Sequence, residues 1–217
     1  MFDAARARRL MVDGQIRTAD VTDAALLEAM LTVPREKFLP PSLAQFAYLD
    51  GDVPIGKGRF LLKPMVLAKL IQAAHVRSAD CVLDVGCGTG YSTAVLARLA
   101  GSVIALEEDA ELARQAKDTL AAVGAARAQI AVGPLAAGWA AGAPYDVILL
   151  NGGFEVVPEA LGGQLKPDGR LVGVCGRSPA TKAMIFHRIE GRLVGRPIFD
   201  AAAPLLPGFA APPTFVF

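Results

Sequence analysis

The sequence has little of what several large protein classes require. It has only three cysteines and two histidines, without C-x-x-C spacing, so we expect no disulfide framework and no metal site. Lys and Arg number 22 against 21 Asp and Glu, which leaves no cationic excess for nucleic acid. No run of about 18 apolar residues exists, and the N-terminus lacks the apolar stretch of a secretory signal. We therefore expect a cytoplasmic monomer with reduced thiols and no membrane or nucleic-acid partner.

The chain does contain the pattern of a single α/β domain. Its 217 residues suit one domain, and from residue 80 short apolar runs alternate with helical patterns. Such runs predict a parallel sheet covered on both faces, that is, a doubly wound fold. The expected strands are 81–85, 103–106, 129–132, 147–150 and 171–174, with helices at 91–99, 110–123 and 156–161. Segments 184–189 and 192–199 meet at Glu190-Gly191 and predict an antiparallel hairpin.

Three regions of this one domain, 1–217, differ in character. Residues 1–76 combine helical patterns with a loop-rich stretch of Pro and Gly, in which we expect short helical turns. Residues 77–176 carry the alternating core, and 177–217 carry the hairpin and a Pro-rich tail. We expect that tail to pack on the domain or to add an edge strand.

A glycine-rich segment between the first strand of the core and its helix carries the chemistry. It runs from Asp84 through Gly86, Cys87, Gly88 and Gly90. Glycines there permit positive φ angles and close approach of a ligand to the backbone. A dinucleotide fingerprint places its third glycine one position later, so the spacing opposes a nicotinamide-dependent oxidoreductase. An acidic residue two places before the first glycine resembles the cofactor loop of S-adenosylmethionine (SAM) methyltransferases.

An acidic residue closes the second strand of the core. Glu107 can accept hydrogen bonds from both hydroxyls of a ribose, which adenosine cofactors of either class require. The following Glu108 and Asp109 suit the positive N-terminal end of a helix dipole. Asp84 suits the ammonium group of SAM. Cys87 contributes backbone contacts, and we expect no redox role for it.

Several segments together resemble the protein-L-isoaspartate O-methyltransferase family. Residues 33–38 read V-P-R-E-K-F, residues 53–56 read V-P-I-G, and 83–99, Glu107 and 158–174 match the family's core. The resemblance spans about residues 10–176. It implies a Rossmann-like class I SAM methyltransferase fold, seven strands with N-terminal helices, and SAM as cofactor with S-adenosyl-L-homocysteine as product. The implied activity is protein repair, in which isoaspartyl carboxylates of damaged proteins are methylated.

The acceptor loop departs from the family pattern. Where that pattern has Thr and its active-site Ser, this sequence has Phe60 and Leu62, although the frame of Ile55, Gly56 and Pro64 survives. Since an ionised carboxylate needs no general base, the lost hydroxyls remove alignment rather than a nucleophile. Arg59 and Lys63 flank this position, and they could bind the carboxylate or point to solvent.

Two further departures lie in the cofactor region. The family's G-D-G reads Gly133-Pro134-Leu135, and its T-A-A reads Asn151-Gly152-Gly153. By position, the resemblance assigns the cofactor-binding role to these residues: Asp84, Gly86, Cys87, Gly88, Gly90, Glu107, Glu108, Pro134 and Leu135. The alternative hypothesis is a SAM-binding paralogue with a changed, unknown acceptor or with no turnover.

Overall fold

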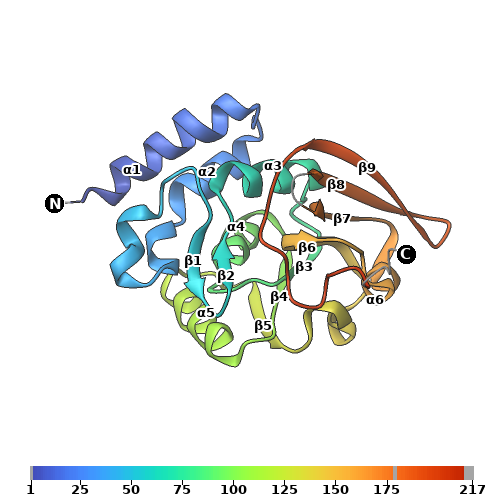
Figure 1. Ribbon diagram of the computed structural model, residues 1–217. Helices are drawn as coiled ribbons and strands as arrows, with labels where there is room; N and C mark the ends of the chain where they lie inside the picture. Colours follow the sequence, from blue (N-terminus) through green and yellow to red (C-terminus); the bar gives the residue numbers. More distant parts are fainter. Residues whose placement is uncertain (1, 178–179, 213–217) are drawn as a thin grey trace, which may run out of the picture.

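The computed structural model describes residues 2–177 and 180–212, and its centre is a seven-stranded sheet (Figure 1). The strand order is β5-β4-β3-β6-β7-β8-β9, and the first five of these strands are parallel. Their bounds are β3 Cys81–Val85, β4 Ser102–Glu107, β5 Ala128–Val132, β6 Tyr145–Phe154, β7 Leu165–Arg177, β8 Ala180–Ile189 and β9 Arg192–Asp200. The strand order reverses between β3 and β6: successive strands are added on one side of β3 up to β5, and on its other side from β6 onwards. Open α/β sheets bind ligands at such a switch point.

Side chains of alternate residues in each strand feed two separate cores. Val82, Val147 and Val172 belong to the larger core, while their neighbours Leu83 and Ile148 belong to the smaller one. Alternation follows from the two-residue period of a strand. The predicted doubly wound sheet with a C-terminal hairpin is thereby confirmed.

The larger core is covered by helices and the smaller one mostly by short turns and irregular chain. The helices are α1 Ala4–Met11, α2 Ala24–Thr32, α3 Pro64–Ala74, α4 Tyr91–Leu99, α5 Ala110–Ala122 and α6 Glu159–Gly163. In the described part of the chain, α6 and the 3₁₀ turn at Leu135–Ala137 pack on the smaller core, and a second 3₁₀ turn at Ala140–Gly142 lies between its residues Trp139 and Ala143. The helix expected at 156–161 therefore begins three residues later, at Glu159, directly after Pro158.

The loop-rich N-terminal region contains an element that the sequence pattern did not predict. Besides the expected short turns at Arg35–Phe38 and Pro41–Phe46, strand β1 (Val53–Gly56) pairs with β2 (Arg59–Leu61) as a small antiparallel hairpin. Three and four residues are too few for a periodic signal. The tip, residues 56–58, turns with positive φ at all three positions, two of which are glycines.

The chain after β9 returns across the sheet as a C-terminal strap, residues 201–209. Gly153 at the end of β6 donates its N–H to Pro204 O at 2.7 Å and accepts from Leu206 N at 2.8 Å. Leu206 and Phe209 are buried in the smaller core. The red segment following β9 runs past β6 towards α6 (Figure 1). The expectation that the tail packs on the domain is confirmed as far as residue 212.

Candidate functional site

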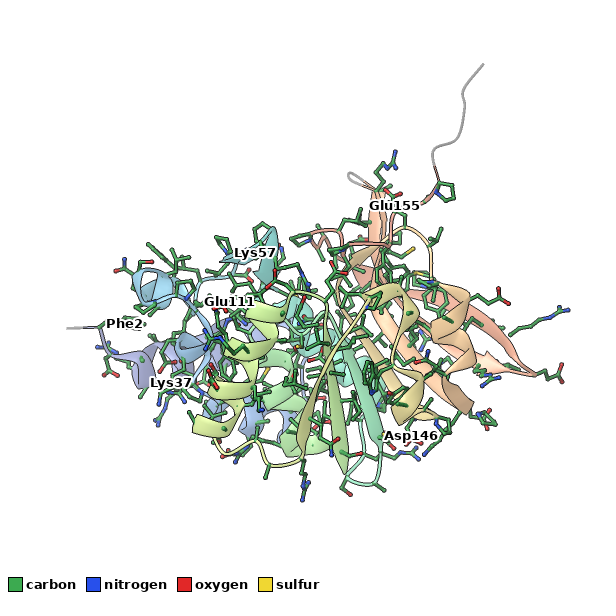
Figure 2. The ribbon with its side chains drawn as sticks, turned by 90° about the horizontal axis from the view of Figure 1, so that it is seen from below. Phe2, Lys37, Lys57, Glu111, Asp146 and Glu155 are labelled. Atoms are coloured by element: carbon green, nitrogen blue, oxygen red, sulfur yellow. The ribbon has the colours of Figure 1, made fainter. Side chains whose placement is uncertain are left out.

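The predicted site residues converge at the carboxyl ends of β3, β4 and β6. Gly86 and Cys87 both donate their backbone N–H to Leu106 O, which joins the glycine loop to β4. In Figure 2, Lys57 of the hairpin tip and Glu155 beyond β6 lie at this end, whereas Asp146, at the start of β6, lies at the opposite end. The site therefore lies at the carboxyl ends of the parallel strands, on the side of the sheet opposite to their amino ends.

Asp84 is fully buried beneath the glycine loop. Its Oδ2 accepts hydrogen bonds from Ser92 Oγ and Thr93 Oγ1, each at 2.6 Å. Its Oδ1 has no hydrogen-bond partner among the described residues. Burial raises the pKa of Asp84 to about 6, although the two hydroxyls oppose that shift. A buried carboxylate with one free oxygen is suited to a cationic ligand group.

The glycines of the loop have different tasks. A Cβ at Gly86 would lie 2.6 Å from Arg59 Nη2, and one at Gly88 would lie 2.5 Å from Ile55 Cδ1. At Gly90 a Cβ would meet Leu120 of α5 at 3.2 Å. All three have positive φ. Gly86 and Gly88 thus allow close approach of the hairpin side, while Gly90 allows close packing of α5.

Glu107 is also fully buried, and backbone donors surround its carboxylate. Its Oε2 accepts from Gly88 N at 2.8 Å, and its Oε1 accepts from Glu108 N at 3.0 Å and Asp109 N at 3.2 Å. Asp109 caps α5 by accepting from the N–H groups of Glu111 and Leu112, as predicted. Exposed Glu108 follows Glu107 at the rim.

Arg59 points into the site and not to solvent. Its side chain is 6% exposed, and its Nη1 donates to Glu107 Oε1 at 2.7 Å. Its Nη2 donates to Gly86 O at 2.8 Å. The guanidinium therefore bridges the two elements that the sequence assigns to the cofactor.

The cavities on the two sides of the Arg59–Glu107 ion pair differ greatly in volume. Between Arg59, Leu62, Asn151 and Leu206 the cavity measures about 10 Å³, room for one water molecule. On the outer side of Glu107, a cleft of about 320 Å³ is lined by Lys57, Glu108, Asp109 and Pro207. Another hollow, of about 800 Å³, lies between α5 and β5 and is mostly apolar. The site is thus open at the Glu107 end and closed at the Asp84 end.

The other acceptor-side residues take different positions. Leu62 is 2% exposed and packs in the larger core, and its carbonyl accepts from Arg35 Nη2 at 2.7 Å. Phe60 is half-buried and lines the 10 Å³ cavity. Lys63 precedes α3, and its backbone N–H donates to Asp52 Oδ1 at 2.8 Å. Leu62 is therefore part of the apolar core.

The remaining predicted cofactor residues differ in what they present. Pro134 is exposed just after β5, and Leu135 packs in the smaller core. Cys87 is fully buried, and burial raises the pKa of its thiol well above its usual range. Its side chain lies in the larger core.

Several site residues escaped the sequence reasoning. Asn151 Nδ2 donates to Ser92 Oγ at 2.8 Å and to Gly86 O at 3.3 Å, and Leu206 reaches over Gly86 from the strap. Ser92 and Thr93 stand in the first turn after the glycine loop, a position that offered a signal. Asn151 was visible only as a departure from the family pattern. Nothing in the sequence marked Leu206.

The arrangement passes a chemical test for an adenosine cofactor with an amino acid end. Besides Asp84 Oδ1, the buried Asn151 Oδ1 has no hydrogen-bond partner among residues 2–177 and 180–212. These acceptors lie beside backbone that comes close only because Gly86 lacks a Cβ. The donor and acceptor set fits an ammonium group at one end and a ribose at Glu107. No cluster of three potential metal ligands occurs in the described ranges.

Comparison with known proteins agrees with this geometry. The family model for protein-L-isoaspartate(D-aspartate) O-methyltransferase matches residues 6–199. A Methylorubrum extorquens protein-L-isoaspartate O-methyltransferase is 46% identical over 170 residues, 78% of this chain and 74% of the relative. An Opitutus terrae protein of the same name is 38% identical over 198 residues, 91% of this chain and 84% of the relative.

Two solved structures share the fold. A protein-L-isoaspartate O-methyltransferase superposes with a TM-score of 0.80 at 25% identity, over 93% of this chain and 66% of that one. The second, from Plasmodium falciparum and in complex with S-adenosyl-L-homocysteine, has a TM-score of 0.78 at 19% identity. It covers 92% of this chain and 97% of its own.

The sheet, its switch point and the match to the family model define a Rossmann-like, SAM-dependent methyltransferase. The chain belongs to the protein-L-isoaspartate(D-aspartate) O-methyltransferase family. No helix of the described part is long and apolar enough to cross a membrane.

Proposed function

We propose that this protein transfers the methyl group of SAM to the free carboxylate of isoaspartyl residues in proteins or peptides. The observation that carries the proposal is the convergence of two fully buried carboxylates, Asp84 and Glu107, at one switch point. Their partners are arranged so that Asp84 keeps one oxygen free while Glu107 lies beside the open cleft. The names of the relatives and the family model support the same reaction.

Asp84 is proposed to bind the ammonium group of the cofactor through Oδ1, and Asn151 Oδ1 lies ready to accept a second hydrogen bond. Glu107 is proposed to bind the ribose hydroxyls. Gly86, Cys87, Gly88 and Gly90 form the backbone cradle. Glu108, Pro134 and Leu135 are also proposed to bind the cofactor, because they follow the ends of β4 and β5. All these groups bind and orient the cofactor.

When bound, SAM supplies a methyl group on a positively charged sulfur, which an ionised carboxylate can take directly, leaving the bonding electron pair on sulfur. The acceptor carboxylate is already ionised at neutral pH, so the site needs no general base. Its remaining task is to hold the acceptor in line and to exclude water, because proximity and orientation supply most of the rate in such transfers. Phe60 and Leu62 provide an apolar wall for that purpose and no hydrogen bond.

A specific observation favours a second candidate, a SAM-binding protein with a different acceptor or without turnover. The position of the active-site hydroxyl is filled by core-packed Leu62, and the neighbouring cavity has only about 10 Å³. An unpaired carboxylate is costly in an apolar environment.

Methyl transfer from labelled SAM to an isoaspartyl peptide, with the normal aspartyl peptide as control, separates the two candidates. Base-labile label on the isoaspartyl peptide alone is the expected result. Cofactor binding in the same preparation without label on either peptide would refute isoaspartyl transfer and establish the second candidate. Absence of cofactor binding would refute both.

We also propose that the protein is a cytoplasmic monomer. Its cysteines Cys81, Cys87 and Cys175 are unpaired, which suits a reducing compartment. Light scattering coupled to size exclusion tests the oligomeric state, and a mass near twice 22.6 kDa would contradict the monomer.

A further inference from the structure

The Arg59 guanidinium occupies groups that the proposed cofactor needs. Glu107 Oε1 and Gly86 O, which it binds at 2.7 and 2.8 Å, belong to the ribose-binding residue and the glycine loop. Its side chain is almost as buried as that of Glu107, at 6% against 0% exposure. A cationic side chain of the acceptor loop is thus docked inside the cofactor half of the site.

The carboxylate of Glu107 has too few free positions for both Arg59 and a ribose. A carboxylate offers about four acceptor positions. Oε1 accepts from Glu108 N, Asp109 N and Arg59 Nη1, whereas Oε2 accepts only from Gly88 N among the described residues, so at most one position, on Oε2, stays open. Two ribose hydroxyls therefore compete with Arg59 for this carboxylate.

Charge alone does not decide the competition, because ionised Asp84 and Glu107 together carry two negative charges. SAM carries an ammonium, a sulfonium and a carboxylate, one net positive charge, which equals the charge of Arg59. What Arg59 and the cofactor cannot share is the hydrogen-bonding position on Glu107. A guanidinium displaced from Glu107 needs a new counter-charge in a poorly solvated site, and a carboxylate of the acceptor matches its planar fork.

The hairpin that carries Arg59 can supply the movement. Its tip contains Gly56 and Gly58, where an added Cβ would meet nothing within 4 Å. The opposite wall, Leu206, is held to β6 by backbone hydrogen bonds of Gly153. We therefore expect the hairpin side of the site to move more readily than the strap side.

We propose that Arg59 is the ligand for the acceptor carboxylate, held on Glu107 and Gly86 until the cofactor displaces it. This inference rests on the proposed function and adds to it the residue that takes over from the missing hydroxyls. It also means that the free protein holds its own competitor for the cofactor.

The first test measures binding of S-adenosyl-L-homocysteine by calorimetry in the wild type and in Arg59→Gln. Removal of an internal competitor raises the fraction of binding-competent protein, so the variant should bind about tenfold more tightly. Glu107 keeps its three backbone donors in this variant. Arg59→Lys, whose single ammonium cannot hold Glu107 and Gly86 in the same fork, provides a second variant if Arg59→Gln does not fold.

The second test measures binding of an isoaspartyl peptide to protein loaded with S-adenosyl-L-homocysteine. Arg59→Gln should weaken peptide binding by about 10- to 100-fold, the range for a charge-assisted hydrogen-bonded pair. Arg59→Lys should retain part of that affinity. The opposite signs of the two effects separate this role from a merely structural one, which would weaken both.

Arg170→Gln is the matched control, because Arg170 pairs with Asp80 at 2.6 Å at the amino end of β3. It should lower thermal stability and leave both affinities unchanged. The proposal is overturned if Arg59→Gln binds S-adenosyl-L-homocysteine no more tightly than the wild type does. It is also overturned if Arg59→Gln and the wild type bind the isoaspartyl peptide with equal affinity. Failure of the proposed function gives a different result, namely wild-type protein that binds cofactor and never methylates the peptide.

Discussion

The cofactor half and the acceptor half of the site are built from different materials. In the cofactor half, backbone N–H groups and hydroxyls from residues adjacent to the strand ends serve Asp84 and Glu107. In the acceptor half, Leu62 packs in the core and Phe60 lines a cavity of about 10 Å³. Arg59 belongs to the β1–β2 hairpin of the acceptor half, but its guanidinium binds Glu107 in the cofactor half. The contrast is between a half held by backbone and hydroxyl donors and a half lined by apolar side chains.

The physical reason for the contrast lies in how each half is held. The backbone donors to Glu107 are fixed by the glycine loop and by the end of β4, so a side-chain substitution leaves them in place. Asp84 depends in addition on the hydroxyls of Ser92 and Thr93. The acceptor half depends on side chains of a short hairpin, whose replacement leaves the sheet in place. The following experiments test this division, beginning with the largest expected effect.

Loss of the Glu107 charge should affect the cofactor half most. Glu107→Gln places an amide N–H₂ among three backbone N–H donors and a guanidinium, and leaves Arg59 without its counter-charge. We expect about 3 kcal/mol weaker cofactor binding, roughly 100-fold, from calorimetry. Glu111→Gln on the exposed face of α5 is the control. Equal affinities for Glu107→Gln and the wild type would show that the ribose lies elsewhere.

Acidification should weaken the cofactor half in a defined range. The pKa of Asp84 is raised to about 6, and a bound ammonium would lower it, so binding requires the ionised form. Affinity should be constant well above pH 6 and fall up to about tenfold per pH unit below it. Calorimetry across pH 4.5–8 measures this. Asp84→Asn should bind more weakly and lose the dependence, and a wild-type profile that is flat through pH 6 would contradict the assignment.

Hydroxyl groups at positions 60 and 62 should raise the activity of the acceptor half. Phe60→Thr with Leu62→Ser should raise isoaspartyl methylation severalfold, because the acceptor carboxylate regains hydrogen-bond donors. The same change removes a buried leucine and should cost about 2–5 kcal/mol of folding stability. Phe60→Thr alone, at a half-buried position, controls for stability. A folded double variant that binds cofactor and shows no gain would refute the alignment argument.

The strap should have the smallest effect on binding. Leu206→Ala removes a side chain that reaches over Gly86 and Gly152, and should raise cofactor affinity by about two- to threefold. The lost burial in the smaller core should lower the melting temperature. If the affinity gain instead exceeded that of Arg59→Gln, the strap and not the hairpin would be the principal barrier.

Most of the fold and the cofactor half followed from local sequence pattern. The strands at 81–85 and 103–106, the helix at 91–99, the glycine loop and Glu107 each rest on periodicity or on neighbours a few residues away. The β1–β2 hairpin did not follow, since its strands are too short for a pattern. The bounds of β6, β7, β8 and α6 were also misjudged, because strand pairing and capping extend or trim elements beyond their apolar segments.

The sequence by itself determined the doubly wound class, the family and the position of Asp84 and Glu107 at strand ends. Only the tertiary structure decided that Arg59 binds Glu107 across a sequence separation of 48, and that Leu206 covers Gly86. The reason is physical. Local elements follow from backbone preferences and periodicity, whereas the direction of a long side chain depends on which groups the completed fold brings within its reach.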